Sequence, residues 1–379
     1  MSFTTTGEHE AIRKAVREFG EEELRPVARE HDEEKKYPED LRRAAAELDF
    51  VAPHIPEEYG GAGMDTIARI IVTEELWRAD PGLGSAIGSA GFGSSMILKY
   101  GDEWMKEEWL PRIAGGESAS CSCISEPAHG SNVAGMETTA EKDGDEWVID
   151  GNKMWITNGT VADVAVVMAK TSPGEGHKGI TAFLVSTDRD GWQPSRIDNK
   201  LGIRASDLAE VVIDDVRVSE DNVIGAVDQG FYQLMDFFAS GRTGVAAQAV
   251  GAAQGAFDAA LDYAGEREQF DQKIGEFQAI RHKLADMATD IEAARSLTYR
   301  AAANVEEGNP DQAARFAAMA KLFASEHAVE VADEALQVFG GSGYVTDYPA
   351  ERYYRDARIT KIYEGTSEIQ KNIIADRLL

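Results

Sequence analysis

IYEGTSEIQ, at residues 362–370 near the C-terminus, is the stretch from which the fold and chemistry of this chain can be argued. It places the carboxylate of Glu364 between an aromatic residue, Tyr363, and a glycine, Gly365. Tyr363 and its apolar neighbours would exclude water from the carboxylate, which raises its pKa and basicity. Gly365 lets a ligand approach the backbone, and Thr366 is a good N-cap for a helix whose free N–H groups can meet an anion. Taken alone, the same pattern also fits an ordinary capped helix start.

Length and composition limit the class of protein. The chain has 379 residues, of which 43% are hydrophobic, so two or three domains are expected. It contains no apolar run near the ~18 residues that a membrane span needs. Residues 1–10 lack the basic and apolar regions of a secretory signal and the Arg-rich character of a transit peptide. We therefore expect a cytoplasmic protein without a membrane segment.

The cysteines and histidines do not indicate a metal site or a disulfide framework. Cys121 and Cys123 are two residues apart on an expected strand, so they should point to one face and behave as small core residues. The seven histidines are scattered, and none pairs with another at the spacing of metal ligands. We expect no bound metal.

The net charge of −29, from 38 Lys and Arg against 67 Asp and Glu, is unusually acidic. Nucleic acids and anionic lipid surfaces require basic patches, so both are excluded as partners. The acidic excess is spread along the chain instead of forming one tail, which favours adaptation to a salt-rich cytoplasm, as in a halophile. A specific basic partner is the alternative.

Hydrophobic periodicity divides the chain into helical, β-rich and again helical parts. Steps of three and four residues predict helices from about residue 5 to 115, including one through the small-residue stretch 84–95. After about residue 230, three long Ala-rich segments with short connections predict an antiparallel bundle. These segments lie near residues 231–265, 276–306 and 310–339.

Short β-rich runs lie between the two helical parts, and the turns 142–145 and 150–152 are of hairpin type. The expected strands cover residues 120–125, 146–149, 153–157, 164–170, 181–186 and 211–218. No helices separate these strands, which argues against a Rossmann arrangement. The expected fold is α+β, with an N-terminal α-helical domain (1–117), a middle antiparallel β domain (118–228) and a C-terminal antiparallel four-helix bundle (229–379).

Four further motifs occur at other places in the chain. They are CISEPAHGSN at residues 123–132, KMWITNG at 153–159, REQF at 267–270 followed by Phe277-Gln278, and QVFGGSGY at 337–344. Together with IYEGTSEIQ and the α–β–α order, they resemble the acyl-CoA dehydrogenase family over essentially the whole chain. Taken alone, each motif has an ordinary alternative. In the order given, these are a strand followed by a turn, a tryptophan in the core, a solvated arginine and a Gly-Gly pair.

The resemblance implies a flavoprotein that binds FAD between the middle domain and the bundle. Trp155 would pack against the flavin ring and Thr157 would hydrogen-bond near its N5 atom. Arg267 would reach across a subunit interface to the pyrophosphate of the partner's FAD, because a guanidinium binds phosphate oxygens in pairs. The implied FAD-binding residues are Ile124, Ser125, Ser131, Trp155, Thr157, Arg267, Phe270, Gln278, Gln337, Gly340, Gly341, Thr366 and Glu368.

The resemblance also implies the residues that meet the acyl-CoA. These are Ser131, Phe238, Arg242, Tyr363 and Gly365. Some family members, acting on isovaleryl or long chains, carry the catalytic base at the position of Gly241, where this chain has no side chain. Glu364 is therefore the one candidate base, and short, medium or short-branched acyl chains are favoured. His129, Asn132 and Ala239 depart from the family pattern and affect contacts on the substrate side.

The implied reaction is α,β-dehydrogenation of an acyl-CoA to a trans-2-enoyl-CoA. Glu364 would take the α-proton, FAD N5 would take the β-hydride, and electrons would pass to electron-transfer flavoprotein. The expected assembly is a homotetramer. An acyl-CoA oxidase-like flavoenzyme is an alternative, although the extra C-terminal domain typical of those oxidases is not expected here. The other alternative is a non-catalytic acyl-CoA-binding protein of the same fold.

Overall fold

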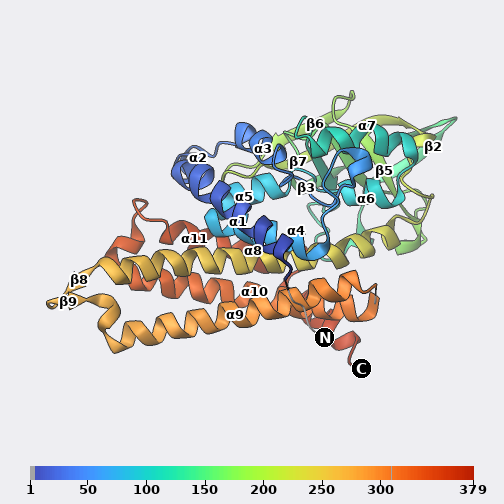
Figure 1. The fold of residues 1–379 in the computed structure, drawn as a ribbon. Coiled ribbons are helices and arrows are strands. Elements are labelled where there is room, and N and C mark those ends of the chain that lie inside the picture. The colour runs from blue at the N-terminus through green and yellow to red at the C-terminus, as the bar shows by residue number, and fades with distance from the viewer. Residues whose placement is uncertain (1–4, 309) are drawn as a thin grey trace.

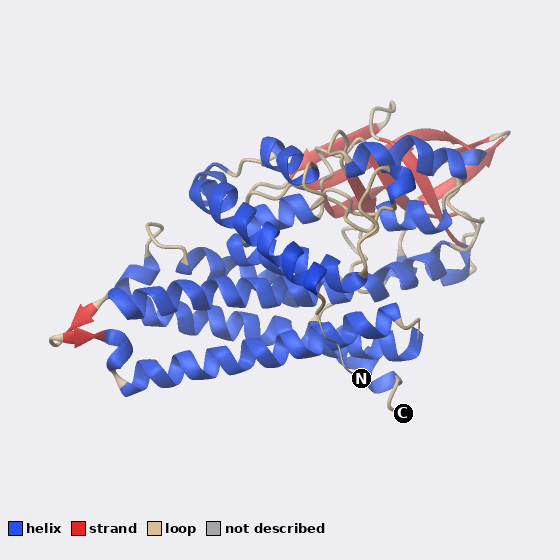
Figure 2. Ribbon diagram, viewed as in Figure 1, coloured by secondary structure: helices blue, strands red, loops and turns tan. Residues whose placement is uncertain are grey.

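A computed structural model describes residues 5–308 and 310–379, which form a helical part, a β-sheet and a second helical part. The sheet and the N-terminal helices lie together on one side of a layer of long C-terminal helices (Figures 1 and 2). No helix of the part described combines the length and apolarity needed to cross a membrane.

The N-terminal helices are α1 (Gly7–Phe19), α2 (Ala28–Glu34), α3 (Glu39–Ala46), α4 (Thr66–Ala79), α5 (Pro81–Gly88), α6 (Ser94–Tyr100) and α7 (Glu103–Ala114). Polar side chains cap the starts of α1, α4 and α5. Asp65 accepts a hydrogen bond from the backbone N–H of Ala68 at 2.7 Å, and Asp80 accepts one from Leu83 at 2.9 Å.

The single helix expected through residues 84–95 is wrong, because α5 ends at Gly88 and α6 starts only at Ser94. Between them, Gly91 forms a bridge with Ser120, and Gly93, the residue just before α6, has φ +106°, a conformation that a helix interior does not contain. The periodic small residues thus form two short helices joined by a turn that contacts the sheet.

The middle part is a seven-stranded sheet in the order β1-β4-β2-β3-β7-β6, with β5 paired to β4. Its strands are β1 (Ser120–Cys123), β2 (Thr139–Asp143), β3 (Glu146–Thr157), β4 (Val164–Lys170), β5 (Ile180–Ser186), β6 (Trp192–Arg196) and β7 (Leu208–Ser219). Pairing is antiparallel except that β4 runs parallel to β1 and β2. The expected strands missed β2 and β6, whose sequences are largely polar and exposed.

The turn predicted at residues 150–152 is also wrong, because β3 runs continuously from Glu146 to Thr157. A register shift against β7 between Ile149 and Gly151 accommodates the glycine. A Cβ at Gly151 would lie 2.2 Å from Oγ1 of Thr138, so the glycine is needed for close packing against Thr138 and not for a turn. The turn predicted at 142–145 is confirmed as the β2–β3 hairpin, with φ +63° at Gly144.

Alternate residues of the central strands face two different cores. Val164 and Val166 of β4 pack into a core shared with the N-terminal helices, whereas Ala165 and Val167 face a core on the opposite side of the sheet. Cys121 and Cys123 are fully buried free thiols in this second core, as the two-residue spacing predicted.

Three long helices dominate the C-terminal part: α8 (Gly230–Glu266), α9 (Gln278–Glu306) and α10 (Pro310–Phe339). Fully buried alanines, such as Ala252 of α8 and Ala332 of α10, line their interface, and small side chains allow close helix packing. The remaining helices are short: α11 (Ala350–Ala357) and α12 (Ser367–Asp376). A hairpin of β8 (Glu268–Gln269) and β9 (Gln272–Lys273) projects from the far end of the bundle (Figure 1).

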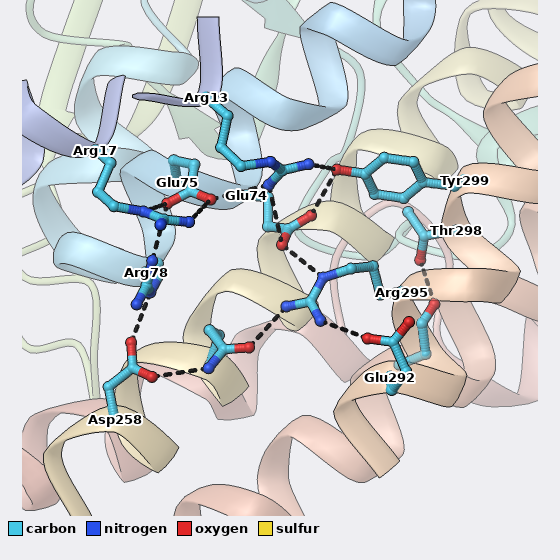
Figure 3. Close-up of polar contacts among 12 residues, drawn as sticks. Arg13, Arg17, Glu74, Glu75, Arg78, Asp258, Glu292, Arg295, Thr298 and Tyr299 are labelled. Carbon is cyan, nitrogen blue, oxygen red and sulfur yellow. Dashed lines mark hydrogen bonds and ion pairs between the residues drawn. The ribbon is translucent and has the colours of Figure 1, made fainter. Parts of the chain in front are cut away.

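Buried ion pairs join the N-terminal helices to the bundle. Glu74 and Glu75 of α4 are each only 2% exposed. Arg13 of α1 contacts Glu75 at 2.9 Å, and Arg295 of α9 donates to Glu74 at 2.9 Å. Tyr299 of α9 donates to Glu74 at 3.1 Å (Figure 3). These contacts hold α1, α4 and α9 in one relative arrangement.

Candidate active site

The segment IYEGTSEIQ forms a tight turn between the 3-10 helix Arg358–Lys361 and α12. Glu364 has φ +50° and Gly365 has φ +92°. The left-handed region costs an L residue about 1–2 kcal/mol, so Glu364 is held in a strained conformation by its surroundings. Thr366 caps α12 by accepting a hydrogen bond from the N–H of Ile369 at 3.4 Å, as the sequence predicted.

Glu364 is half-buried, and the Oε2 atom of its carboxylate is fully buried. Burial raises its pKa from 4.5 to about 7, against the opposing effect of the positive charges of Lys321 and Arg242. Its Oε2 atom is buried and has no hydrogen-bond partner among the described residues. A buried carboxylate oxygen left without a donor is free to accept a proton from a ligand.

Helix α8 provides the wall opposite this carboxylate. A Cβ added at Gly241 would lie 2.1 Å from Glu364 Oε2 and 3.2 Å from its Cδ. The missing side chain at residue 241 therefore makes room for the carboxylate that comes from the C-terminal turn. The next residue, Arg242, is 8% exposed, and burial lowers the pKa of its guanidinium.

Two side chains that the sequence analysis did not single out hold the turn from behind. Lys321 of α10 donates through Nζ to the Gly365 carbonyl at 2.6 Å, and Gln370 of α12 donates to the same oxygen at 2.7 Å. Tyr363 donates through its hydroxyl to Gln248 of α8. Each bond ties the turn to a different long helix or to α12.

Lys321 was detectable in the sequence, because it occupies an apolar stripe of α10. Ala317, Ala320, Ala324 and Ala328 lie at helical spacing around it and are almost fully buried. A lysine at such a position must find buried acceptors, which is a signal of a specific role.

Phe238 lies one helical turn before Arg242 on α8. Its ring lies 5.9 Å from that of Phe237, which in turn lies 5.3 Å from Phe92 in the turn between α5 and α6. The small-residue stretch that ends at Ser95 thus reaches the same part of α8 as the substrate-side candidates. The structure brings Phe238, Arg242, Tyr363, Glu364 and Gly365 into one group.

A second group gathers the flavin-side candidates of the sheet. The backbone N–H of Met154 on β3 donates to the Ser125 carbonyl at 2.9 Å, which places Ile124 and Ser125 beside the end of β3. Trp155 has φ +64° and is 56% exposed, an unusual state for a large aromatic residue. Its uncovered ring, near the half-buried Thr157, fits a planar aromatic group such as the flavin ring.

Ser131 lies exposed in the loop after β1. In the same loop, Nε2 of His129 lies 3.6 Å from Oε1 of Glu137. Glu368 is exposed in the first turn of α12. These positions remain candidates for contacts with a long ligand.

The remaining FAD candidates lie at the far end of the bundle. They are Arg267, Phe270, Gln278, Gln337, Gly340 and Gly341, all exposed, with Phe270 88% exposed. From Gly241 to the end of α8 the helix runs roughly 38 Å at about 1.5 Å per residue. One chain therefore does not bring this third group to Glu364, and the β8–β9 hairpin carries Phe270 away from the rest of the molecule (Figure 1).

Two other features do not belong to this site. A cavity of about 630 Å³ lies among the α1–α4–α9 ion pairs, where Glu74 and Glu75 are already paired with arginines. The ligand atoms of Asp290, His327 and Glu330 come within 4.8 Å of one another, an approach of α9 and α10 that the sequence spacing did not predict. These three side chains are partly exposed, and contacts of His327 with Glu330 at 3.2 Å and with Asp290 at 3.6 Å account for the cluster.

Comparison with protein families agrees with this arrangement. The N-terminal, middle and C-terminal domain models of acyl-CoA dehydrogenases match residues 6–117, 121–216 and 228–379. A buried carboxylate oxygen on the bundle side and an uncovered aromatic ring on the sheet fit an oxidoreductase that binds a planar cofactor such as a flavin. The chain belongs to the acyl-CoA dehydrogenase family, whose members are FAD flavoproteins that act on the CH–CH bond of acyl-CoA.

Individual relatives match over nearly the whole chain. The short-chain specific acyl-CoA dehydrogenase of Rattus norvegicus is 42% identical over 98% of this chain and 90% of the relative. The structure of butyryl-CoA dehydrogenase from Megasphaera elsdenii superimposes with a TM-score of 0.95 and 37% identity, covering all of both chains. A structure described as the electron transferring flavoprotein of Acidaminococcus fermentans superimposes with a TM-score of 0.96 and 40% identity, also over all of both chains.

Proposed function

We propose that the protein oxidises a short acyl-CoA to its trans-2-enoyl-CoA, with Glu364 as the base that removes the α-proton. The observation that carries the proposal is the Glu364 carboxylate, which is desolvated, has an unpartnered Oε2 and lies against the side-chain-free Gly241. A pKa of about 7 makes this group a stronger base than an exposed glutamate while leaving it substantially ionised near neutral pH.

The residues of the chain would act in a defined order. The apolar group around Phe238 receives the acyl chain, and the turn presents the backbone N–H of Glu364 to the thioester carbonyl. Polarising that carbonyl makes the α-proton acidic enough for Glu364 Oε2 to take it. FAD, when bound against Trp155 and Thr157, supplies the acceptor for the two electrons that leave with the β-hydrogen. Arg242, whose charge acts on Glu364, would remain beside the carboxyl group once it is protonated.

The length of the acyl chain is proposed to be short. The relatives support this, since their names refer to short-chain specific and butyryl-CoA substrates. The position of the base in the C-terminal turn, opposite Gly241, is consistent with the same class.

We further propose a homotetramer of three-domain subunits, divided at residues 1–117, 118–228 and 229–379. The exposed third group of FAD candidates supports assembly, since Arg267, Phe270 and Gln278 would contact the FAD of a partner subunit. Electron-transfer flavoprotein is the proposed electron acceptor, and the net charge of −29 supports a salt-rich cytoplasm.

The test is Glu364→Gln, which keeps the shape of the side chain but removes its ability to accept the proton. We expect the variant to retain FAD and to bind butyryl-CoA, while the rate of flavin bleaching by substrate under anaerobic conditions falls by at least about a thousandfold. The measurement is the visible spectrum in high salt, with acyl-CoAs from butyryl to palmitoyl.

The matched control is Glu307→Gln, at an exposed carboxylate just after α9. It should bleach at the rate of the unmodified protein. Near-normal bleaching by Glu364→Gln would refute Glu364 as the base, and fastest bleaching with palmitoyl-CoA would refute the short-chain assignment.

A further inference from the structure

We propose that Lys321 is the positioning residue of the Glu364 base: its buried ammonium holds the Glu364–Gly365 turn and keeps the neighbouring carboxylate in its proton-accepting form. The proposal rests on the proposed role of Glu364 and adds to it the group that controls the base. Nothing in the reaction itself requires a lysine at this place, so the role follows from the geometry of this chain.

Two buried side chains hold the turn through hydrogen bonds. Lys321 is 0% exposed, and its Nζ donates to the Gly365 carbonyl at 2.6 Å. Gln370, also 0% exposed, donates to the same oxygen at 2.7 Å and to the Glu364 carbonyl at 3.4 Å. Two donors on one carbonyl use both of its lone pairs and fix the peptide plane. The bonds help to hold Glu364 at φ +50°, a conformation that is strained for a residue other than glycine, whereas Gly365 adopts φ +92° without strain.

Charged side chains from three helices surround the Glu364 carboxylate and the Lys321 ammonium. Glu364 is faced by Lys321 from α10 and by Arg242 from α8, and both favour its ionised form against the effect of burial. Lys321 is itself faced by Glu364, by Glu326 on its own helix and by Glu368 on α12, with Arg242 opposing. Burial lowers the pKa of Lys321 to about 8, so near pH 7 it still carries a positive charge.

The sign of the effect follows from these charges. Burial alone would raise the pKa of Glu364 above about 7. Removing the ammonium of Lys321 leaves burial opposed only by Arg242, so the pKa of Glu364 rises. A larger fraction of the base is then protonated and inactive at neutral pH, and activity returns as the pH is raised.

The experiment compares the FAD-loaded wild-type protein with Lys321→Met, using the pH dependence of kcat/KM for flavin bleaching by butyryl-CoA. We expect the acid limb of the wild-type profile near pH 7. In Lys321→Met the acid limb should move upward by at least about one pH unit, with a loss of rate at pH 7 of at least about fivefold. The loss should appear in kcat, with KM changed by less than about threefold.

Lys361→Met is the matched control. Lys361 ties the 3-10 helix Arg358–Lys361 to Glu326 of the same helix α10, but its charge is not among those that act on Glu364. This variant should lower the unfolding temperature without moving the acid limb. If the acid limb shifts equally in Lys321→Met and Lys361→Met, loosening this segment is enough to change the pKa of Glu364. That result would overturn the specific role of Lys321.

An acid limb that stays in place in Lys321→Met also overturns the proposal. If that variant does not take up FAD, Lys321→Gln, which keeps a donor without a charge, must show the same upward shift. If neither neutral variant takes up FAD, Lys321→Arg must keep the wild-type limb, and a shifted limb overturns the proposal. If Glu364→Gln still turns over, Glu364 is not the base and the proposed function is refuted as well. If Glu364→Gln is inactive but the acid limb of Lys321→Met does not move, only the proposed role of Lys321 is refuted.

Discussion

At the scale of single residues, the C-terminal turn shows how one glycine on a distant helix determines where a carboxylate can lie. Glu364 occupies a left-handed conformation, and its Oε2 atom fills the space that a Cβ at Gly241 would take. The two positions are separated by most of the C-terminal part of the sequence. Their side chains compete for one volume, so only one of them can carry a base.

Gly241→Ala should therefore damage the site with little effect on the rest of the molecule. The added methyl group would lie 2.1 Å from Glu364 Oε2, and the carboxylate must move to relieve the overlap. Since displacements of about 1 Å can cost about a hundredfold in rate, we expect kcat for flavin bleaching to fall ten- to a hundredfold with FAD content unchanged.

Gly244→Ala on the same helix is the control for that prediction. A Cβ at residue 244 meets no atom within 4 Å of the described structure, and alanine is a better helix former than glycine. This variant should keep full activity and be slightly more stable. If it loses as much activity as Gly241→Ala, the effect comes from the helix and not from contact with Glu364.

At the scale of secondary-structure elements, a buried ion pair joins the end of β1 to β3. Lys153 of β3 is 0% exposed, and its Nζ lies 2.9 Å from Oε1 of Glu126. Glu126 also accepts hydrogen bonds from the Thr138 backbone at 3.0 Å and from the Thr138 hydroxyl at 2.6 Å. The pair thus places Ser125 relative to Trp155, the two ends of the proposed flavin platform.

The pKa of Glu126 determines how this pair responds to pH. Burial alone would raise the pKa, but Lys153, the Thr138 hydroxyl and the Glu137 N–H together lower it to about 2. A carboxylate whose pKa is lower in the folded state stabilises the protein above its unfolded value of 4.5. That contribution is lost as the pH falls from about 4.5 toward 2.

Lys153→Met should lower the free energy of unfolding by about 3 kcal/mol at pH 7, because it leaves Glu126 buried without its cation. The deficit should shrink below about pH 4.5, where the carboxylate can be protonated, and urea unfolding at both pH values measures it. Lys142→Met is the control, since Lys142 forms an exposed pair with Glu220 and should cost less than about 1 kcal/mol. A deficit for Lys153→Met that is the same at both pH values would contradict the ion-pair explanation.

At the scale of the whole molecule, a strongly acidic surface encloses several well-packed cores. The net charge of −29 creates self-repulsion in the folded state, whereas the cores of the sheet and bundle are apolar and independent of salt. The carboxylates of Glu74 and Glu75 are buried, so salt screens their ion pairs less than it screens exposed surface charges (Figure 3). Added salt therefore acts mainly on the surface charge.

We expect the unfolding temperature to rise as potassium chloride is increased from about 0.1 M to about 2 M, because the screening length falls from about 10 Å to below 3 Å. Scanning calorimetry of the FAD-loaded protein measures this rise. Sucrose at equal osmolality is the control, since it favours compact states without screening charge. An unfolding temperature that does not change or falls with potassium chloride would contradict the proposed adaptation to salt.

The local sequence was sufficient for the order of the parts and for the features whose cause is local. Periodicity placed α8, α9 and α10, the spacing of Cys121 and Cys123 predicted one buried face, and Thr366 was recognised as the cap of α12. Two predictions from the local sequence were wrong: the helix through residues 84–95, which is interrupted before Gly93, and the turn at residues 150–152. There, contacts with the sheet and a strand bulge outweighed the local preference for a helix or a turn.

Only the tertiary structure showed that Lys321 lies beside Glu364 and that the Glu364 carboxylate fills the space next to Gly241. The motif IYEGTSEIQ indicated a desolvated carboxylate, and the family resemblance had already linked Gly241 and Arg242 to the same site. Tertiary packing also set how far Arg267 lies from this site, since most of the length of α8 separates the two. The physical reason is that burial and electrostatic interaction depend on distances in space, and neighbours from other helices are set by packing that no single segment encodes.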